Sequence, residues 1–190
     1  MNKITLRAIF FLLLMSSSFW LFAEYENTVE LRSAAFIPTD NLFRDIYGNA
    51  GASYQLEASS AVYEGLDVWG NLDLFSKPGR SVGLGNSTEI LIANTSVGIK
   101  VPFQFSEKIS PYIGIGISLG RVWLKNNSFC GEDKASKFAV GGVLKTGINY
   151  FFMENVFLDV FIDYLYQPVH FETDIDIGGL KTGIGLGIQF

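Results

Sequence analysis

The eleven residues at positions 180–190 alternate strictly between two kinds of side chain. One kind is mainly apolar and the other is mainly glycine, and a period of two is typical of a β-strand with two unlike faces. An ordinary soluble sheet carries charged or long polar side chains opposite its core, whereas this strand carries glycine there. We therefore expect the apolar face to meet lipid and the glycine face to meet the crowded inside of a closed barrel. The first set is Leu180, Thr182, Ile184, Leu186, Ile188 and Phe190, and the second is Lys181, Gly183, Gly185, Gly187 and Gln189.

The composition indicates a single β-rich domain. The chain has 190 residues, of which 15% are aromatic, 17% are charged and 20 are glycine. Abundant aromatic residues and glycine with few charges favour strands over helices, and this length suits one domain with a sizeable core. The net charge is -5. Because no cluster of Lys and Arg is available to neutralise phosphates, we exclude a nucleic-acid partner.

The N-terminal segment is typical of a Sec signal peptide. A short basic segment precedes a continuously apolar run at 8–15, and the serines behind this run lead to a cleavage site after Ala23. We therefore expect a signal peptide over 1–23 and a mature β-barrel domain over 24–190. An uncleaved anchor helix is the alternative, although the serines interrupt the run before it reaches a membrane-spanning length. No later apolar run is long enough for a spanning helix, so insertion after export must use strands.

Seven further segments show the same alternation of apolar with polar or small residues. Long polar connections follow the first, third, fifth and seventh predicted strands, and shorter connections follow the others. This asymmetry is expected when both termini lie in the periplasm and the long loops lie outside. The predicted fold is an all-β, single eight-stranded antiparallel transmembrane barrel of up-and-down topology, which leaves no open sheet edge. The seven strands are 28–37, 50–58, 66–75, 89–103, 112–120, 138–150 and 156–166, the long connections are 39–48, 76–88, 125–136 and 167–174, and 59–65 is a short return.

Charged residues on the second parity of these strands are expected to point into the barrel. Placing one Lys or Arg on the lipid face at the bilayer midplane would cost roughly 2–4 kcal/mol, which excludes the opposite orientation. Buried charges must be paired or hydrated. An eight-stranded barrel is wide enough only for its own side chains or one small ligand, so we interpret the charges as a structural polar plug. Lys145 is expected to face the strand that carries Asp159, Lys100 the strand that carries Asp67 and Asp73, and Lys181 is available to Glu30 on the first strand. The expected interior charges are Glu30, Arg32, Glu57, Asp67, Asp73, Lys100, Lys145, Asp159, Asp163 and Lys181.

Three features carry a resemblance to a known class: the signal-like start, the alternation of strands and loops, and the closing segment 183–190. In these features the chain resembles the small eight-stranded outer-membrane β-barrels of Gram-negative-type bacteria. That class includes attachment and invasion proteins and the membrane domain of the major porin-like outer-membrane protein. The resemblance implies an outer-membrane location, with membrane lipid and the barrel-assembly machinery as partners. It also implies an assembly signal in the last strand, carried by Ile184, Leu186, Ile188 and the terminal Phe190.

Two residues are candidates for chemistry in the predicted external loops. His170 lies near Glu172 and Asp174 but near no serine, so a solvated loop histidine is expected, and a lipid A-modifying enzyme is the alternative. Cys130 is the only cysteine, which excludes an internal disulfide and leaves either an unpaired thiol or an intermolecular disulfide. Because no cluster of metal-ligating residues is visible, we expect no metal, no cofactor and no enzyme activity.

We expect the external loops to carry the function of the protein. This function would be adhesion, contact with a host or envelope surface partner, or a contribution to envelope integrity. The first loop carries the most apolar candidates, which either contact a partner or fold over the barrel mouth as a lid. A narrow pore or a binding barrel for a small ligand is the alternative function. The candidate loop contacts are Leu42, Phe43, Arg44, Ile46, Tyr47, Cys130 and His170.

Overall fold

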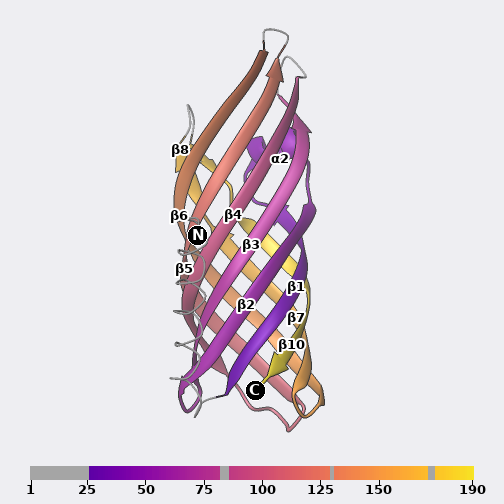
Figure 1. Ribbon diagram of the computed structural model, residues 1–190, viewed down its shortest axis with the longest axis vertical. Helices are drawn as coiled ribbons and strands as arrows, with labels where there is room; N and C mark the ends of the chain where they lie inside the picture. The colour runs from indigo at the N-terminus through magenta and orange to yellow at the C-terminus, as the bar shows by residue number, and fades with distance from the viewer. Residues whose placement is uncertain (1–25, 82–85, 129–130, 171–173) are drawn as a thin grey trace, which may run out of the picture.

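Eight strands form a closed antiparallel barrel in the computed structural model (Figure 1). The structure describes residues 26–81, 86–128, 131–170 and 174–190, so the predicted signal peptide at 1–23 lies outside the described residues. The predicted fold class is confirmed. The barrel strands are β1 (Asn27–Pro38), β2 (Gly51–Tyr63), β3 (Leu66–Arg80), β4 (Ser87–Pro102), β5 (Ile109–Ser128), β6 (Gly131–Met153), β7 (Val156–Tyr166) and β10 (Gly179–Gln189).

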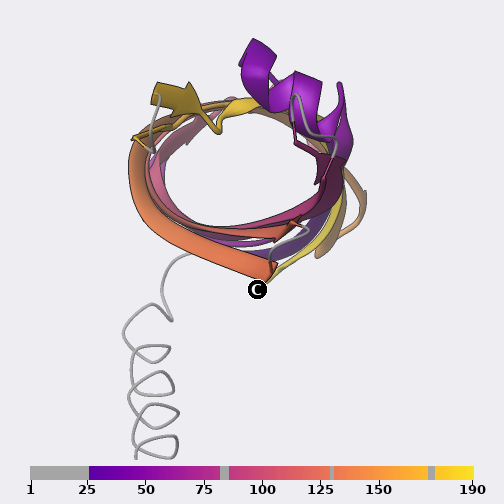
Figure 2. The same cartoon turned by 90° about the horizontal axis from the view of Figure 1, so that it is seen from above.

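The last strand closes the barrel onto the first. Each barrel strand pairs with its neighbour along the chain, and β10 pairs with both β7 and β1, which completes the ring seen from above in Figure 2. The β1–β10 ladder runs from Thr28 opposite Gln189 to Pro38 opposite Gly179. Because every strand has two partners, the N–H and C=O groups of the barrel wall are satisfied without water, as a lipid environment requires.

The two ends of the barrel differ in their connections (Figure 1). At the end that holds Asn27 and Phe190, which we call the terminal end, short turns join β2 to β3, β4 to β5 and β6 to β7. At the opposite end, which we call the loop end, the β1–β2 connection carries the helix α2 (Asn41–Tyr47). The β7–β10 connection there carries a hairpin of β8 (Pro168–His170) and β9 (Asp174–Asp176). The β5–β6 hairpin projects furthest at this end.

Three segments that the sequence predicted as loops or returns are strands for most of their length. β2 continues through 59–63, β3 continues through 76–80, and the β5–β6 hairpin includes most of 125–136. Gly, Ser and Asn in these segments disfavour an isolated strand. Each segment nevertheless has a partner strand whose ladder satisfies its backbone N–H and C=O groups. Pairing to a neighbour therefore overrides the local turn signals.

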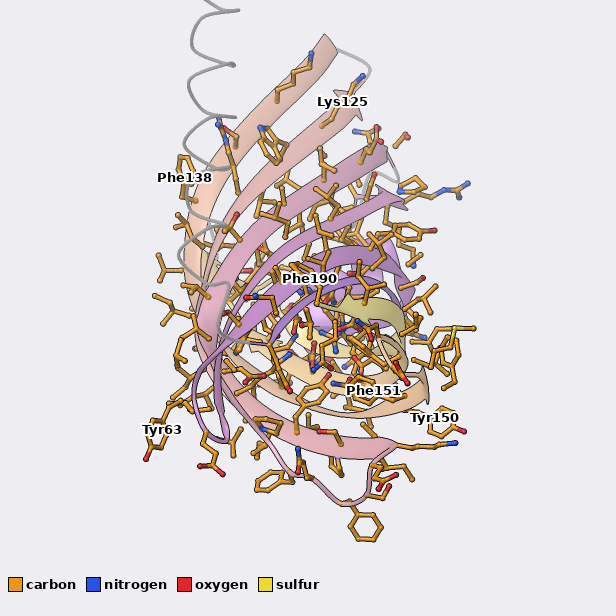
Figure 3. All side chains as sticks on the ribbon, turned by 60° about the horizontal axis from the view of Figure 1, so that its bottom comes forward. Tyr63, Lys125, Phe138, Tyr150, Phe151 and Phe190 are labelled. Carbon is orange, nitrogen blue, oxygen red and sulfur yellow. The ribbon has the colours of Figure 1, made fainter. Side chains whose placement is uncertain are left out.

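The outward face of the barrel is a band of apolar side chains. Leu31 of β1 is 68% exposed and Ile117 of β5 is 67% exposed, and in β1 the residues between the exposed ones are buried. This arrangement is the reverse of a soluble protein and suits an apolar solvent around the barrel. Tyr63 and Tyr150 point outward near the terminal end, and Phe138 lies toward the loop end (Figure 3). Aromatic residues at both ends of an apolar band are expected at the two membrane interfaces.

The helix α2 forms in a connection that the sequence analysis left without secondary structure. Asp40 precedes it in an extended conformation and accepts a hydrogen bond from the backbone N–H of Phe43 at 3.0 Å, which is an N-cap. Gly48 follows it with φ of 83°, and its N–H donates to the C=O of Arg44 at 2.7 Å. Glycine suits this left-handed position because it has no Cβ. The helix and the β8–β9 hairpin lie beside each other along the rim (Figure 2).

Candidate functional site

Arg32 of β1 lies inside the barrel with its side chain fully buried. Its Nη1 donates to the carboxylates of Glu57 and Asp163, each at 3.0 Å. Its Nη2 donates to Asp159 and to the hydroxyl of Tyr112, each at 2.7 Å. These partners come from β2, β5 and β7, so one guanidinium connects β1 to three other strands. Arginine suits this position because its planar fork presents several fixed N–H donors.

Two further contacts surround the same guanidinium. Glu30 and Glu57 stand directly opposite each other on β1 and β2, an arrangement that is unfavourable for two carboxylates on their own. The Nε of Arg32 lies 3.2 Å from Glu30 Oε1, so the cation sits beside both carboxylates. The guanidinium carbon lies 3.6 Å from the ring centroid of Phe161, within the range of a cation–π contact.

Lys145 and Lys100 extend this ion network. The Nζ of Lys145 lies 2.7 Å from Glu57 and 2.9 Å from Asp163, and it also lies 4.8 Å from the ring centroid of Trp69. The Nζ of Lys100 lies 3.4 Å from the same Glu57. Glu57 therefore has three cationic neighbours, since it also pairs with Arg32.

Lys181 and Asp73 form a second ion pair in the interior. The carboxylate of Asp73 also accepts hydrogen bonds from the hydroxyl of Ser53 and from the amide of Asn94, the latter at 3.3 Å. Lys181 comes from β10 and Asp73 from β3, which are not neighbours in the barrel. The pair therefore crosses the lumen rather than linking adjacent strands.

Lys145 faces β7, the strand that carries Asp159, as predicted, whereas the predicted partner of Lys181 was wrong. Lys145 contacts Asp163, which lies opposite it in register, while Asp159 contacts Arg32. Lys181 contacts Asp73 on the far wall instead of Glu30 on the neighbouring strand, because a long side chain in a narrow barrel reaches across the lumen. Lys100 faces β3, the strand that carries Asp67 and Asp73, as predicted. Lys100 stands opposite Asp67 in register but bonds Glu57, and Asp67 itself is half-buried near the terminal end.

The interior at the level of these charges is filled by side chains. A cavity lined by Trp69, Asn71 and Lys145 has a volume of about 20 Å³, which is room for about one water molecule. The rings of Trp69, Phe157 and Phe161 are each 1% exposed and occupy much of the remaining cross-section. Among the described residues, five acidic and four basic side chains are buried in this region. They are Glu30, Glu57, Asp73, Asp159 and Asp163, with Arg32, Lys100, Lys145 and Lys181.

An apolar cluster lies between the interior charges and the loop end. Phe43 of α2 packs against Phe36 and Phe75 of the barrel wall, with ring centroids 6.2 and 6.3 Å apart. The hydroxyl of Tyr47 lies 3.3 Å from Thr88 Oγ1. Burial raises the pKa of Tyr47 above its ordinary value. The buried members of the cluster are Phe36, Phe43, Tyr47, Phe75, Ile90, Ile92, Val122, Ala139, Val169 and Ile177.

The candidate residues of the first loop lie on or beside α2, which we call the lid; Phe43 and Tyr47 belong to the cluster and Ile46 packs against it. Phe43 and Tyr47 are buried, and Leu42, Arg44 and Ile46 are half-buried. The burial of Phe43 and Tyr47 against the barrel wall is what the lid interpretation predicts, and contact of this loop with a partner stays a prediction. The sequence contains a signal for the lid, since an N-cap residue precedes three apolar residues at positions 43, 46 and 47 that share one helical face.

The other candidate residues are only partly described. The backbone of His170 lies at the end of β8 opposite Asp174, and its side chain is outside the described part of the structure. Cys130 lies outside the described residues. Within the described residues, no group of three or more His, Cys, Asp or Glu side chains could hold a metal ion.

Several interior polar residues were not singled out from the sequence. Gln55 and Glu57 both accept hydrogen bonds from the amide of Asn71, at 2.9 and 3.3 Å. The amide of Gln167 donates to Ser118 at 3.4 Å, close to the base of the β8–β9 hairpin. Neutral polar residues on the inward parity were the available signal, because such groups need partners when they are buried.

The fold and part of the sequence match known proteins. A family model described as "Opacity family porin protein" matches residues 80–190. No curated protein matches the chain in sequence.

Solved structures share the barrel at low sequence identity. OprG from Pseudomonas aeruginosa is 14% identical, with a TM-score of 0.66 over 87% of this chain and 96% of that chain. Ail, the attachment invasion locus protein of Yersinia pestis, in complex with the heparin analogue sucrose octasulfate, is 14% identical, with a TM-score of 0.59 over 87% of this chain and 99% of that chain. Neisserial surface protein A is 17% identical, with a TM-score of 0.55 over 87% and 96% of the two chains. These similarities concern the fold.

Proposed function

The chain belongs to the Opacity family of porin proteins, and on that basis we propose that it acts at the cell surface through its loop end, by adhesion to a surface partner. The protein is a small eight-stranded outer-membrane β-barrel of the class that includes Ail and Neisserial surface protein A. Barrels of the Opacity and Ail type are non-enzymatic surface proteins. An adhesive role is therefore favoured over catalysis at His170.

The proposed orientation places the loop end outside the cell and the terminal end in the periplasm. Short turns on the periplasmic side and longer connections outside are general among outer-membrane barrels. The barrel resembles this pattern, because its loop end carries α2, the β8–β9 hairpin and the projecting β5–β6 hairpin, whereas the end with Asn27 and Phe190 has only turns between strands. Residues 1–23 act as the export signal in this proposal.

The projecting β5–β6 hairpin is the observation that carries the adhesive role. β5 has 20 residues and β6 has 23, whereas the other barrel strands have 11 to 16. A strand needs about 9–11 residues to cross a bilayer. The hairpin therefore extends well beyond the membrane and offers a surface that the filled interior does not. The Ail structure holds a heparin analogue, which supports a sulfated glycan as one partner class to test.

A shortened hairpin tests this role. Lys125 and Lys134 are opposite each other in register, so replacing residues 126–133 with Asn-Gly would join them by a two-residue turn. We expect a strain that gains adhesion to epithelial cells on expressing the full chain to lose most of it with the shortened chain. Heat-modifiable migration of both proteins in outer-membrane fractions provides the folding control. Equal adhesion by the two strains would reject the hairpin as the adhesive element.

A narrow pore is the alternative function. We propose instead that the ion network is a structural plug, supported by the small cavity beside Trp69 and by the lid over the loop end. Single-channel recording on the purified, folded protein discriminates between the two. No conductance is expected, and a stable conductance would favour the pore.

A further inference from the structure

A pocket opens on the outward face of the barrel where β4, β5 and β6 approach the loop end. Its volume is about 400 Å³, and it lies on the lipid-facing side of the wall rather than in the lumen. Its lining combines cations with aromatic and apolar groups, a composition unlike that of the apolar band next to it. The lining residues that the argument uses are Glu89, Leu91, Arg121, Trp123, Lys125 and Lys134.

Arg121 is the central cation of this pocket. Its guanidinium carbon lies 5.0 Å from the ring centroid of Trp123 and 5.1 Å from that of Phe138, so two aromatic rings hold it by cation–π contacts. Its side chain is exposed on the outward face. A guanidinium stacked in this way keeps N–H groups available at its edge, and that edge matches the oxygens of a phosphate.

The charge of the pocket is positive although the protein as a whole carries a net charge of -5. Lys125 and Lys134 stand directly opposite each other on β5 and β6, and Glu89 stands opposite Lys125 on β4. With Arg121, the described residues that line the pocket include three cations and one carboxylate. An anion placed beside these two lysines would be attracted to both of them.

The pocket lies at the edge of the apolar band, and this position indicates which kind of anion it could bind. Leu119 of β5 and Val140 of β6 lie on the outward face next to it and are 54% and 68% exposed. From Ile113 to Arg121 is a stretch of nine residues, about the length that crosses a bilayer. Arg121 therefore lies where the apolar band ends. A molecule bound here meets apolar wall on one side and cations on the other, as a lipid with acyl chains and a phosphorylated headgroup does.

We propose that this pocket binds the phosphorylated headgroup of an anionic lipid in the membrane leaflet at the loop end. Arg121 contacts the phosphate with its planar edge, Lys125 and Lys134 add charge, and the acyl chains lie along Leu119 and Val140. With the orientation proposed above, this is the outer leaflet. A sulfated glycan would use the cations but not the apolar wall, so the combination favours lipid. The lipid site is separate from the proposed adhesive element. It lies on the membrane side of residues 126–133, which are the residues replaced in the adhesion test.

Native mass spectrometry of the full, folded protein with added lipid A tests the proposal. The probes are bisphosphorylated lipid A and the same lipid after removal of both phosphates. The test variant combines Arg121→Gln, Lys125→Gln and Lys134→Gln, and the control variant combines Arg80→Gln with Lys108→Gln, which removes two cations elsewhere. We expect the wild type and the control to retain the phosphorylated lipid, and the test variant to bind it at least tenfold more weakly.

A conservative variant keeps the proposal testable if the triple variant does not fold. Arg121→Lys keeps the charge but loses the planar edge, so we expect an intermediate loss of about threefold with unchanged heat-modifiable migration. Several outcomes would overturn the proposal: equal retention of the dephosphorylated lipid, equal binding by the triple variant, or no retention by the wild type. Complete displacement of the lipid by an equimolar amount of heparin or of inorganic phosphate would also overturn it, because the acyl chains would then add no affinity.

Discussion

Arg32 on β1 and Asp159 on β7 form a 2.7 Å hydrogen bond although their strands do not pair. Between these strands lies β10, in which Gly185 stands opposite Arg32 on one side and opposite Asp159 on the other. Gly185 faces the lumen, and a Cβ on it would meet the side chains of Glu30 and Arg32. Because β10 has glycine on its lumen face, it leaves room for the side chains of the interior ion network.

Arg32→Met is expected to destabilise the barrel strongly. It leaves several buried carboxylates without their shared cation, and breaking a buried ion pair from one side costs roughly 3–5 kcal/mol. Urea unfolding in lipid vesicles, followed by heat-modifiable migration, gives the free energy of unfolding. Arg80→Met, at an exposed position, is the matched control. A loss below about 1 kcal/mol for Arg32→Met would mean that the network contributes little to stability.

Gly185→Val is expected to cost about 1–3 kcal/mol of unfolding free energy, because the added side chain overpacks the lumen beside Arg32. Gly70→Ala is the control, since the nearest atom to an added Cβ there is Ser96 O at 4.0 Å. The same urea unfolding measurement applies to both variants. Equal stability of the two variants would show that the interior rearranges to accept a side chain at Gly185.

Phe43→Ala is expected to release the lid without unfolding the barrel. The residue is 2% exposed and packs against Phe36 and Phe75, so the substitution removes much of the contact between α2 and the barrel wall. Limited proteolysis should then cleave the 39–50 connection at least several-fold faster, while heat-modifiable migration stays unchanged. Asp45→Ala, on the exposed side of the helix, is the control. Unchanged cleavage would show that α2 is held by other contacts.

Phe190→Ser is expected to lower the fraction of protein assembled in the outer membrane. The substitution removes the proposed recognition side chain but keeps the backbone bonds between Phe190 and Asn27, at 2.9 and 3.0 Å. Phe105→Ser, in the β4–β5 turn where the ring is 80% exposed, is the control. The ratio of folded to unfolded migration in membrane fractions is the measurement. Normal assembly of Phe190→Ser would count against a terminal-Phe signal.

The alternation of side chains predicted the barrel and the direction of its faces. The seventh predicted strand, 156–166, has the same bounds in the structure, and the inward parity of Asp159 and Asp163 is as expected. The ends of the strands were harder to predict, because pairing with the neighbouring strand determines where each strand ends. The β5–β6 hairpin continues through residues that break an isolated strand, since each has a paired neighbour.

The partners of the interior charges could not be read from the sequence. Register relations between adjacent strands are local, but Lys181 reaches Asp73 on the opposite wall and Arg32 reaches Tyr112 on β5. Such contacts depend on the width of the closed barrel and on which rings already occupy it. The outward cluster of Arg121, Trp123 and Phe138 likewise requires the pairing of β5 with β6.

The sequence by itself determined that residues 180–190 form a strand with a lipid face and a lumen face, because a period of two in a chain of few charges allows little else. Only the tertiary structure decided why the lumen face is glycine. Closing β10 between β7 and β1 brings Arg32, Glu30 and Asp159 over Gly185, where a side chain would fill their space. Parity is a property of one strand, whereas the packing of a narrow lumen is a property of all eight.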